Sequence, residues 1–335
     1  MKNILIDIGG CDYPQKMIGG AVEAANAFSA YAVTIVGDEN VILPAIGKNK
    51  PNNLYVEHAP DVITNDDTPT RAIRKKPDSS LVKAIDILNG SDDCIGLISG
   101  GSTGAVLTGA TLLVKRIKGV HRPVLASFMP TAIEGKLVCI ADSGANVDSK
   151  PEFLAQFAVM ADMYVRAMFG TEKPRIGLLS VGTEDHKGDE RTRAVHAMLK
   201  ETSLNFVGNM EARDALTGDY DVIVTDGFAG NVLIKAVEGT AKMVMGEVKK
   251  AMFSSLKSKI GALLMKKSLY KLKGRMDYHA YGGAAFLGVK KLVLKTHGSS
   301  NEVSTKASVA NLIKMYEHNI IDDISKGMAE EPDGE

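Results

Sequence analysis

The 335-residue chain has few cysteines, no excess of one charge and no long apolar run. Its three cysteines, Cys11, Cys94 and Cys139, lie far apart without a CxxC spacing, so we expect no metal site and no disulfide framework. This usage fits a reducing compartment. Lys plus Arg and Asp plus Glu both number 40, so no global electrostatic field favours nucleic acid as a partner. No apolar run approaches the ~18 residues that a membrane-spanning helix needs.

Two phosphate-binding fingerprints are absent as well. The chain contains neither a GxGxxG dinucleotide motif nor a GxxxxGK[ST] loop, and a dehydrogenase therefore lacks support, as does any cofactor. The first strand reaches an acid at Asp7, too early for a signal peptide. We therefore expect a cytoplasmic protein that could still lie at the inner face of the cell membrane.

Short apolar runs alternate with helical patterns along most of the chain. The predicted strands are Asn3–Ile8, Val33–Val36, Leu54–Val56, Cys94–Ser99, Val124–Met129, Leu137–Ala141, Ile176–Val181, Val222–Thr225 and Leu292–Leu294. The predicted helices are Lys16–Phe28, Leu81–Leu88, Thr103–Lys115, Pro151–Met168, Asp189–Glu201 and Asn231–Ala251. Continuous apolar strands between helices indicate a mostly parallel, doubly wound α/β sheet covered on both faces. No clear linker interrupts residues 1–335, which we interpret as a single domain with a helical segment appended within it.

The loops at the strand ends are rich in Gly and small polar residues. The loop Ser99–Ala105 joins a strand to a helix and carries the hydroxyls of Ser102 and Thr103, a combination suited to cradling phosphate. A plain tight turn would use the same residues. Asp7, Asp142 and Asp226 each end a strand, where an acid positions a nucleophile, binds a cation or, most often, caps a loop.

Two further loops carry basic groups. Lys187 lies in the loop Gly182–Asp189, where it would pair with phosphate or a developing oxyanion, unless the loop is a solvated charged turn. His297 follows the predicted strand Leu292–Leu294 and would act as an acid, base or donor, or cap a turn. We predict that phosphate binds between the Ser99–Ala105 loop and the Lys187 loop, and that His297 lies near the reacting carbonyl.

Taken in order, the loops resemble the PlsX family of phosphate:acyl-carrier-protein acyltransferases. The matching motifs are Arg71–Lys76, Gly119–Pro123, Gly144–Asp148, Lys150–Glu152, Gly182–Glu184, Lys187–Gly188, Gly208–Arg213, Asp226–Phe228, Gly230–Asn231, Tyr281–Ala284 and His297–Ser299. The chain departs from the family pattern at Gly9–Cys11, at Gly101–Ser102 and at Ala229. The resemblance runs from Ile4 to about Asn301, so it covers nearly the whole chain.

The resemblance implies a homodimeric α/β/α enzyme with a phosphotransacetylase and isocitrate-dehydrogenase-like fold, acting without a cofactor. It would convert acyl-acyl-carrier protein and inorganic phosphate to acyl phosphate by direct displacement, for phospholipid synthesis. The candidate catalytic residues are Lys187, His297 and Asn231. The candidate substrate-binding residues are Asp7, Gly10, Ser99, Gly101, Ser102, Thr103, Gly104, Asp142, Asn146, Gly182, Asp226, Gly227, Gly230, Gly282 and Gly283. Two alternatives stay open: a phosphotransacetylase using a coenzyme A thioester, and a catalytically impaired, membrane-associated scaffold.

A basic amphipathic segment is predicted at residues 249–275. From Lys249 to Met276 the chain has nine Lys or Arg residues and no acid. The segment's expected surface contacts are Lys249, Lys250, Phe253, Leu256, Lys257, Lys259, Ile260, Lys266 and Lys267. Such a helix suits reversible contact with an anionic membrane, docking of an acidic carrier protein, or packing against a dimer partner.

Overall fold

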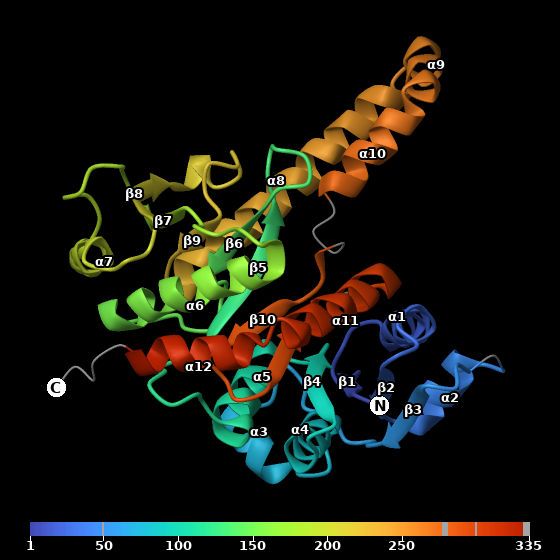
Figure 1. Ribbon diagram of the computed structural model, residues 1–335. Helices are drawn as coiled ribbons and strands as arrows, with labels where there is room; N and C mark the ends of the chain where they lie inside the picture. The colour runs from blue at the N-terminus through green and yellow to red at the C-terminus, as the bar shows by residue number, and fades with distance from the viewer. Residues whose placement is uncertain (49, 277–280, 299, 331–335) are drawn as a thin grey trace.

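The protein is described here by a computed structural model, covering residues 1–48, 50–276, 281–298 and 300–330 (Figure 1). Eleven strands form one sheet in the order β3-β2-β1-β4-β11-β10-β5-β6-β9-β7-β8. The strands are β1 (Asn3–Asp7), β2 (Ala32–Gly37), β3 (Leu54–His58), β4 (Cys94–Ser99), β5 (Val124–Pro130), β6 (Leu137–Ala141), β7 (Ile176–Ser180), β8 (Phe206–Glu211), β9 (Val222–Val224), β10 (Ala284–Leu287) and β11 (Leu292–Lys295).

Helices cover both faces of this sheet. They are α1 (Pro14–Ala27), α2 (Glu39–Ile46), α3 (Pro69–Lys75), α4 (Ser80–Gly90), α5 (Thr103–Gly109), α6 (Pro151–Phe169), α7 (Glu190–Lys200), α8 (Gly227–Phe253), α9 (Leu256–Leu264), α10 (Lys266–Met276), α11 (Glu302–Glu317) and α12 (Ile320–Glu330). A π-helical turn, η1 (Ala110–Val114), extends α5, and a 3-10 turn, η2 (Ala212–Asp214), follows β8. The predicted three-layer α/β/α fold is confirmed.

Alternation along the strands builds the layers. On β1, Ile4 and Ile6 join one buried cluster with α1, α6 and α11, whereas Leu5 joins another with α4 and α5. A third buried cluster packs β6 and β9 against Leu233 of α8. Successive side chains of a strand point to opposite faces, so strands buried on both sides read as unbroken apolar runs.

The strands do not all run in the same direction. Seven neighbouring pairs are parallel, but β11–β10, β10–β5 and β5–β6 are antiparallel. These three reversals turn β6, β9, β7 and β8 against β1, β4 and β11. The loops after β4 and β7 therefore leave opposite edges of the sheet, contrary to the single ligand-binding edge expected from the sequence.

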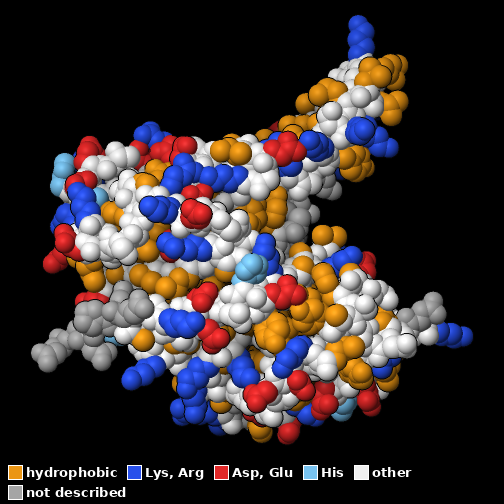
Figure 2. Space-filling view, viewed as in Figure 1, with side chains coloured by type: hydrophobic (Ala, Val, Ile, Leu, Met, Phe, Trp, Pro, Cys, Tyr) orange, Lys and Arg blue, Asp and Glu red, His pale blue; other side chains and the backbone are white. Residues whose placement is uncertain are grey.

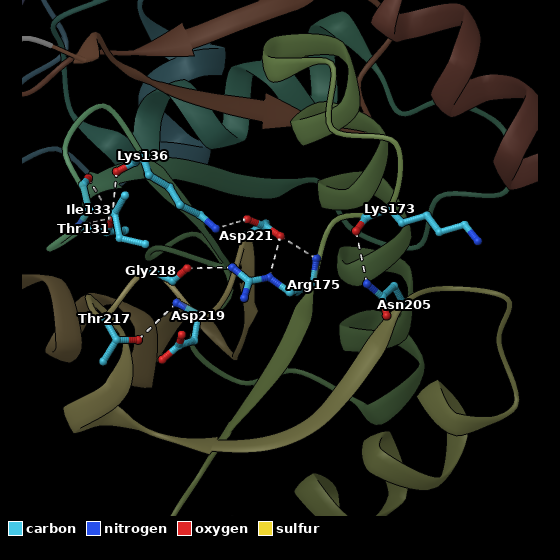
Figure 3. Close-up of polar contacts among 10 residues, drawn as sticks. All are labelled: Thr131, Ile133, Lys136, Lys173, Arg175, Asn205, Thr217, Gly218, Asp219 and Asp221. Carbon is cyan, nitrogen blue, oxygen red and sulfur yellow. Dashed lines mark hydrogen bonds and ion pairs between the residues drawn. The ribbon is translucent and has the colours of Figure 1, made fainter.

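An acidic residue ties together the starts of three strands in the second half of the sheet. Figure 3 shows Asp221, which precedes β9, between Lys136 before β6 and Arg175 before β7. The Lys136 Nζ lies 2.8 Å from one carboxylate oxygen, and the Arg175 backbone N–H donates to the other at 2.8 Å. This cluster therefore joins the amino ends of β6, β9 and β7. The loops that follow these strands leave from the other end of the sheet.

The basic segment is a helical hairpin rather than one helix. Residues 249–276, called here the projecting hairpin, comprise the last turns of α8, then α9, then the returning α10 (Figure 1). The chain breaks at Ser255, whose side chain caps α9 by accepting from the Ser258 N–H. Lys271 on α10 pairs with Glu134 in the β5–β6 loop, with Nζ and Oε1 2.7 Å apart. No helix in the described part of the chain is long and apolar enough to cross a membrane.

Candidate active site

A polar cavity of about 400 Å³ lies where the centre of the sheet meets the start of α8. It brings together segments far apart in the sequence: the turn after β1, the turn after β4, the first turns of α8, the start of β10 and the end of β11. Eight of the predicted site residues line it: Gly10, Gly101, Ser102, Thr103, Asn231, Gly282, Gly283 and His297. The remaining predicted residues, described next, lie outside its walls.

Asp7 and Ser99 support the cavity from behind. Both side chains are fully buried, and the Ser99 hydroxyl donates to the Asp7 carboxylate at 2.6 Å. The Gly9 N–H donates to the same carboxylate at 2.9 Å. Burial raises the pKa of Asp7, while these hydrogen bonds oppose the rise. An added Cβ at Gly101 would lie 2.9 Å from the Gly9 carbonyl oxygen, so the two turns approach as only glycine allows.

Asp142 organises the loop after β6 in the same way. Its buried carboxylate accepts hydrogen bonds from the backbone N–H groups of Gly144, Ala145 and Asn146, at 2.7 to 2.9 Å. The Asn146 amide also donates to it at 2.7 Å. Asp142 and Asn146 thus shape the loop whose Gly144 lines the cavity. Gly104 lies in the first turn of α5, outside the cavity lining.

The start of α8 is seated directly on this loop. A Cβ at Gly230 would lie 1.9 Å from the Asp142 carbonyl oxygen, and one at Gly227 would lie 2.8 Å from Asn146 backbone atoms. Asp226 caps the helix by accepting from the Ala229 N–H at 2.8 Å, and Arg191 pairs with its other oxygen. Capping, the commonest reading of an acid at a strand end, accounts for Asp226 here.

The structure does not bring Lys187 and Gly182 to the polar cavity. Their loop follows β7, and five strands separate β7 from β4. Across a sheet this is a gap of roughly 28 Å, besides the opposite strand direction. A phosphate on the Ser102 turn is therefore out of reach of Lys187 within one chain, unlike the arrangement expected from the sequence. The catalytic role of Lys187 stays a prediction.

The turn after β4 also contains Gly100-Gly101-Ser102-Thr103-Gly104, which fits the Gly-x-Ser-x-Gly pattern of a strained nucleophile elbow. Ser102 has φ −56° and ψ 129°, an ordinary extended conformation. The sharp strained turn that exposes a nucleophilic serine is absent at this residue. The geometry thus agrees with direct displacement, with Ser102 as a donor rather than a nucleophile.

His297 meets two charged residues that the sequence analysis missed. Its Nε2 lies 3.4 Å from the Lys235 Nζ, which in turn lies 2.8 Å from a Glu238 carboxylate oxygen. Lys235 and Glu238 come from α8 and line the same cavity as the Ser102 turn. Their spacing of three residues on a helix predicts a pair, but no signal in the sequence connects them to His297. The adjoining Ser299 of the same motif lies outside the described residues.

Lys295 is another cavity residue that the sequence did not assign to the site. It ends β11, pairs in register with Ser99 on β4 and Ala284 on β10, and lines the cavity. Its neighbours on β11 are all buried, and burial lowers its pKa to about 8. The sequence signal was a lysine placed directly between an apolar strand and His297. In the described part of the chain, no three His, Cys, Asp or Glu side chains are grouped to hold a metal.

A larger apolar groove of about 1480 Å³ adjoins the polar cavity. It runs between α8, α10 and the end of β5, and it shares Met129, Lys235, Glu238 and His297 with the cavity. Of the predicted surface residues, Lys249, Phe253, Lys259 and Lys266 line this groove, whereas Lys250, Leu256, Lys257, Ile260 and Lys267 do not. Figure 2 shows apolar and basic side chains intermingled along the projecting hairpin.

The chain matches known proteins over nearly its full length. The model of a family described as "Fatty acid synthesis protein" matches residues 2–323. A "Phosphate acyltransferase" of Brevibacillus brevis is 41% identical over 333 residues, 99% of each chain. One of Bacillus pumilus is 46% identical over 301 residues, 89% of each chain.

Solved structures show the same fold at low identity. A branched-chain phosphotransacylase from Enterococcus faecalis superposes with a TM-score of 0.61 and 16% identity, covering 95% of this chain and 100% of its own. A phosphotransacetylase from Streptococcus pyogenes gives 0.59 and 16%, covering 94% of each chain. With the family match and the full-length relatives, the resemblance read from the loop motifs is confirmed: the chain belongs to the PlsX family of phosphate acyltransferases.

Proposed function

We propose that this enzyme transfers a long acyl group from an acyl-carrier-protein thioester to inorganic phosphate, giving acyl phosphate for phospholipid synthesis. A phosphate oxygen attacks the thioester carbonyl carbon, the carbon–sulfur bond breaks, and the carrier thiolate leaves and takes up a proton. The observation that carries the proposal is the continuity of the polar cavity with the apolar groove through Met129, Lys235, Glu238 and His297. The reaction needs a polar compartment and an apolar one that meet at the reacting carbon.

The polar cavity supplies the groups that the chemistry requires. Ser102, Thr103 and Asn231 can donate hydrogen bonds to phosphate or to the carbonyl oxygen as it gains charge. His297, beside Lys235 at 3.4 Å, stands at the junction, where it can hand a proton to the leaving sulfur. Holding phosphate and thioester in line lowers the barrier further, without a covalent enzyme intermediate.

The apolar groove supports a long-chain thioester substrate over a small coenzyme A thioester. A phosphotransacetylase acting on a small coenzyme A thioester has no use for an apolar groove along α8, whose inner face presents Ala241, Met245 and Met252. A long hydrocarbon chain would bury its apolar surface there, at about 25 cal/mol per Å² removed from water. The groove therefore favours the long-chain carrier-protein substrate.

The test is to mix the purified full chain with long-chain acyl-acyl-carrier protein and phosphate and to detect acyl phosphate, with acetyl-coenzyme A as the parallel substrate. In the variant Ala241→Trp, an indole fills the groove, so kcat/KM for the long chain should fall roughly 100-fold while a short chain is spared. Ala251→Trp, on the exposed side of the same helix, is the matched control. Equal losses for both chain lengths would remove the acyl chain from the groove, and no turnover at all would support the scaffold alternative.

We also propose that the protein works as a homodimer in reversible contact with the anionic inner face of the membrane. Exposed apolar residues of α8, namely Phe228, Val232 and Met243, favour packing against a second copy. At the far end of the projecting hairpin, Leu256 and Leu264 are 75% and 83% exposed among lysines, the pattern of a shallow membrane anchor. The lysines would equally receive an acidic carrier protein.

A further inference from the structure

Lys295 is the most deeply buried cationic side chain that lines the polar cavity. Its residue is 8% exposed, because β11 lies between β4 and β10 in the middle of the sheet. The strand holds it in register beside Ser99, so the side chain stands at the turn that carries Ser102 and Thr103. A rigid central strand, rather than a mobile loop, therefore sets its position.

The charge of Lys295 is not neutralised by an ion pair. Its ammonium group donates to the carbonyl oxygen of the adjacent Thr296, and no carboxylate of a described residue lies within ion-pairing distance. Asp7, a buried acid that acts electrostatically on Lys295, is already bonded by Ser99 and Gly9. Asp7 and Asp12 attract the ammonium group through space, but burying it without a direct ion pair is costly, so an anion that enters the cavity would stabilise its charge.

We propose that the ammonium group of Lys295 binds the inorganic phosphate directly and is the principal cation of the phosphate site. This inference rests on the proposed function, and it replaces Lys187 with Lys295 as the phosphate-binding lysine. The hydroxyl-bearing turn at Ser102 and Thr103 lines the same cavity and would share the phosphate oxygens. The same chemistry would also suit the phosphodiester of the carrier's prosthetic group, a source that the experiment separates.

The charged and titratable groups around Lys295 define how binding depends on pH. They are Asp7 from β1, Cys11 and Asp12 from the following turn, His297 from its own strand end, and Lys235 and Glu238 from α8. Phosphate remains a dianion above pH 8. Since burial lowers the pKa of Lys295 to about 8 and raises that of Cys11 to about 11, Lys295 loses its proton first as pH rises. Phosphate affinity should then fall roughly tenfold for each further pH unit.

The experiment is calorimetric titration of the full chain with inorganic phosphate alone, at several pH values from 7 to 10. Lys295→Met keeps an unbranched buried side chain without the charge, and it should weaken phosphate binding roughly tenfold or more and abolish the pH dependence. Lys295→Arg keeps a charge that does not titrate here, so binding should persist across the range. Lys290→Met changes an exposed lysine two residues before β11, and this variant should bind phosphate as the unmodified protein does.

Three outcomes would overturn the inference. They are unchanged phosphate affinity in Lys295→Met, affinity of the unmodified protein that stays level from pH 8 to 10, and a variant defect confined to the KM of the carrier thioester. The last would assign Lys295 to the carrier's phosphodiester. The pH titration needs no variant, so a level affinity refutes the inference even if Lys295→Met fails to fold, and Lys295→Arg then tests the assignment to this residue. Phosphate binding through Lys295 without acyl phosphate formation would refute the proposed function and leave this inference standing.

Discussion

The α/β body and the projecting hairpin use charged and apolar side chains in opposite ways. In the body, β2 and β4 bury every residue, and even Asp7, Asp142 and Lys295 lie inside. In the hairpin, α9 has no buried residue, and its leucines and lysines are exposed together. The body therefore encloses its charged groups and bonds Asp7 and Asp142 internally, whereas the hairpin leaves its apolar and basic surface for a partner. Variants in the body should therefore change stability, whereas variants in the hairpin should change binding to a partner.

The largest effect on stability is expected in the body, at Asp142. In Asp142→Ala, the N–H groups of Gly144, Ala145 and Asn146 lose their buried acceptor. Each unsatisfied buried group costs about 1 to 3 kcal/mol, so the free energy of unfolding should fall by roughly 3 kcal/mol or more. Urea denaturation measures it. Asp148→Ala, at an exposed position in the same loop, should change it by less than about 0.5 kcal/mol, and equal effects would contradict the assignment.

An intermediate effect is expected on the exposed face of α8 that precedes the projecting hairpin. The double variant Val232→Asp with Met243→Asp places two charges in the proposed dimer contact, so sedimentation should show monomers. Loss of the partner lowers the apparent free energy of unfolding by about 2.7 kcal/mol when the protein concentration is a hundred times the Kd, and by less at lower concentration. A double variant that stays dimeric would show that this face of α8 is not the interface.

The smallest effect on stability is expected at the hairpin's tip. Leu256→Ser with Leu264→Ser removes exposed apolar side chains, so the free energy of unfolding should change by less than about 0.5 kcal/mol. Sedimentation with vesicles should nevertheless show loss of binding, because apolar insertion and the lysines act together. In the unmodified protein, binding should require anionic lipid and weaken with salt. Retained vesicle binding, or a dissociated dimer, would contradict the assignment of membrane contact to the hairpin's tip and of dimer contact to the earlier part of α8.

The strands were the part of this fold most readable from sequence, since buried apolar runs leave a local mark. Cys94–Ser99 and Leu137–Ala141 have the bounds that the sequence predicted. The strand β8 was missed because its burial is uneven, and β10 because four residues make a weak signal. The reversal of β6, β7 and β9 depends on which distant strands pair, which no local pattern reports.

The candidate site was predictable to the same extent. Glycines and hydroxyls of the Ser102 turn lie in the cavity as expected, since they mark their own turn. Lys187 looked equivalent to them because its loop also follows a strand, and the difference lies in the direction and place of that strand. Lys295 was overlooked because a lysine after an apolar run resembles an exposed strand end. Its burial comes from β4 and β10, which are distant in the sequence.

Because α8 is long, a small rotation at its start produces a large displacement at its end. Its 27 residues run ~40 Å as an α-helix, from the capped end at Asp226 to Phe253. A rotation of about 5° at the fixed end would move the far end by about 3.5 Å over that length. Gly227 and Gly230 pack closely against the Asn146 and Asp142 backbone and fix the direction of the helix. A small change of angle at this contact therefore becomes a large change in the width of the groove. A methyl group added at this pivot would alter a cleft many residues away that it never touches.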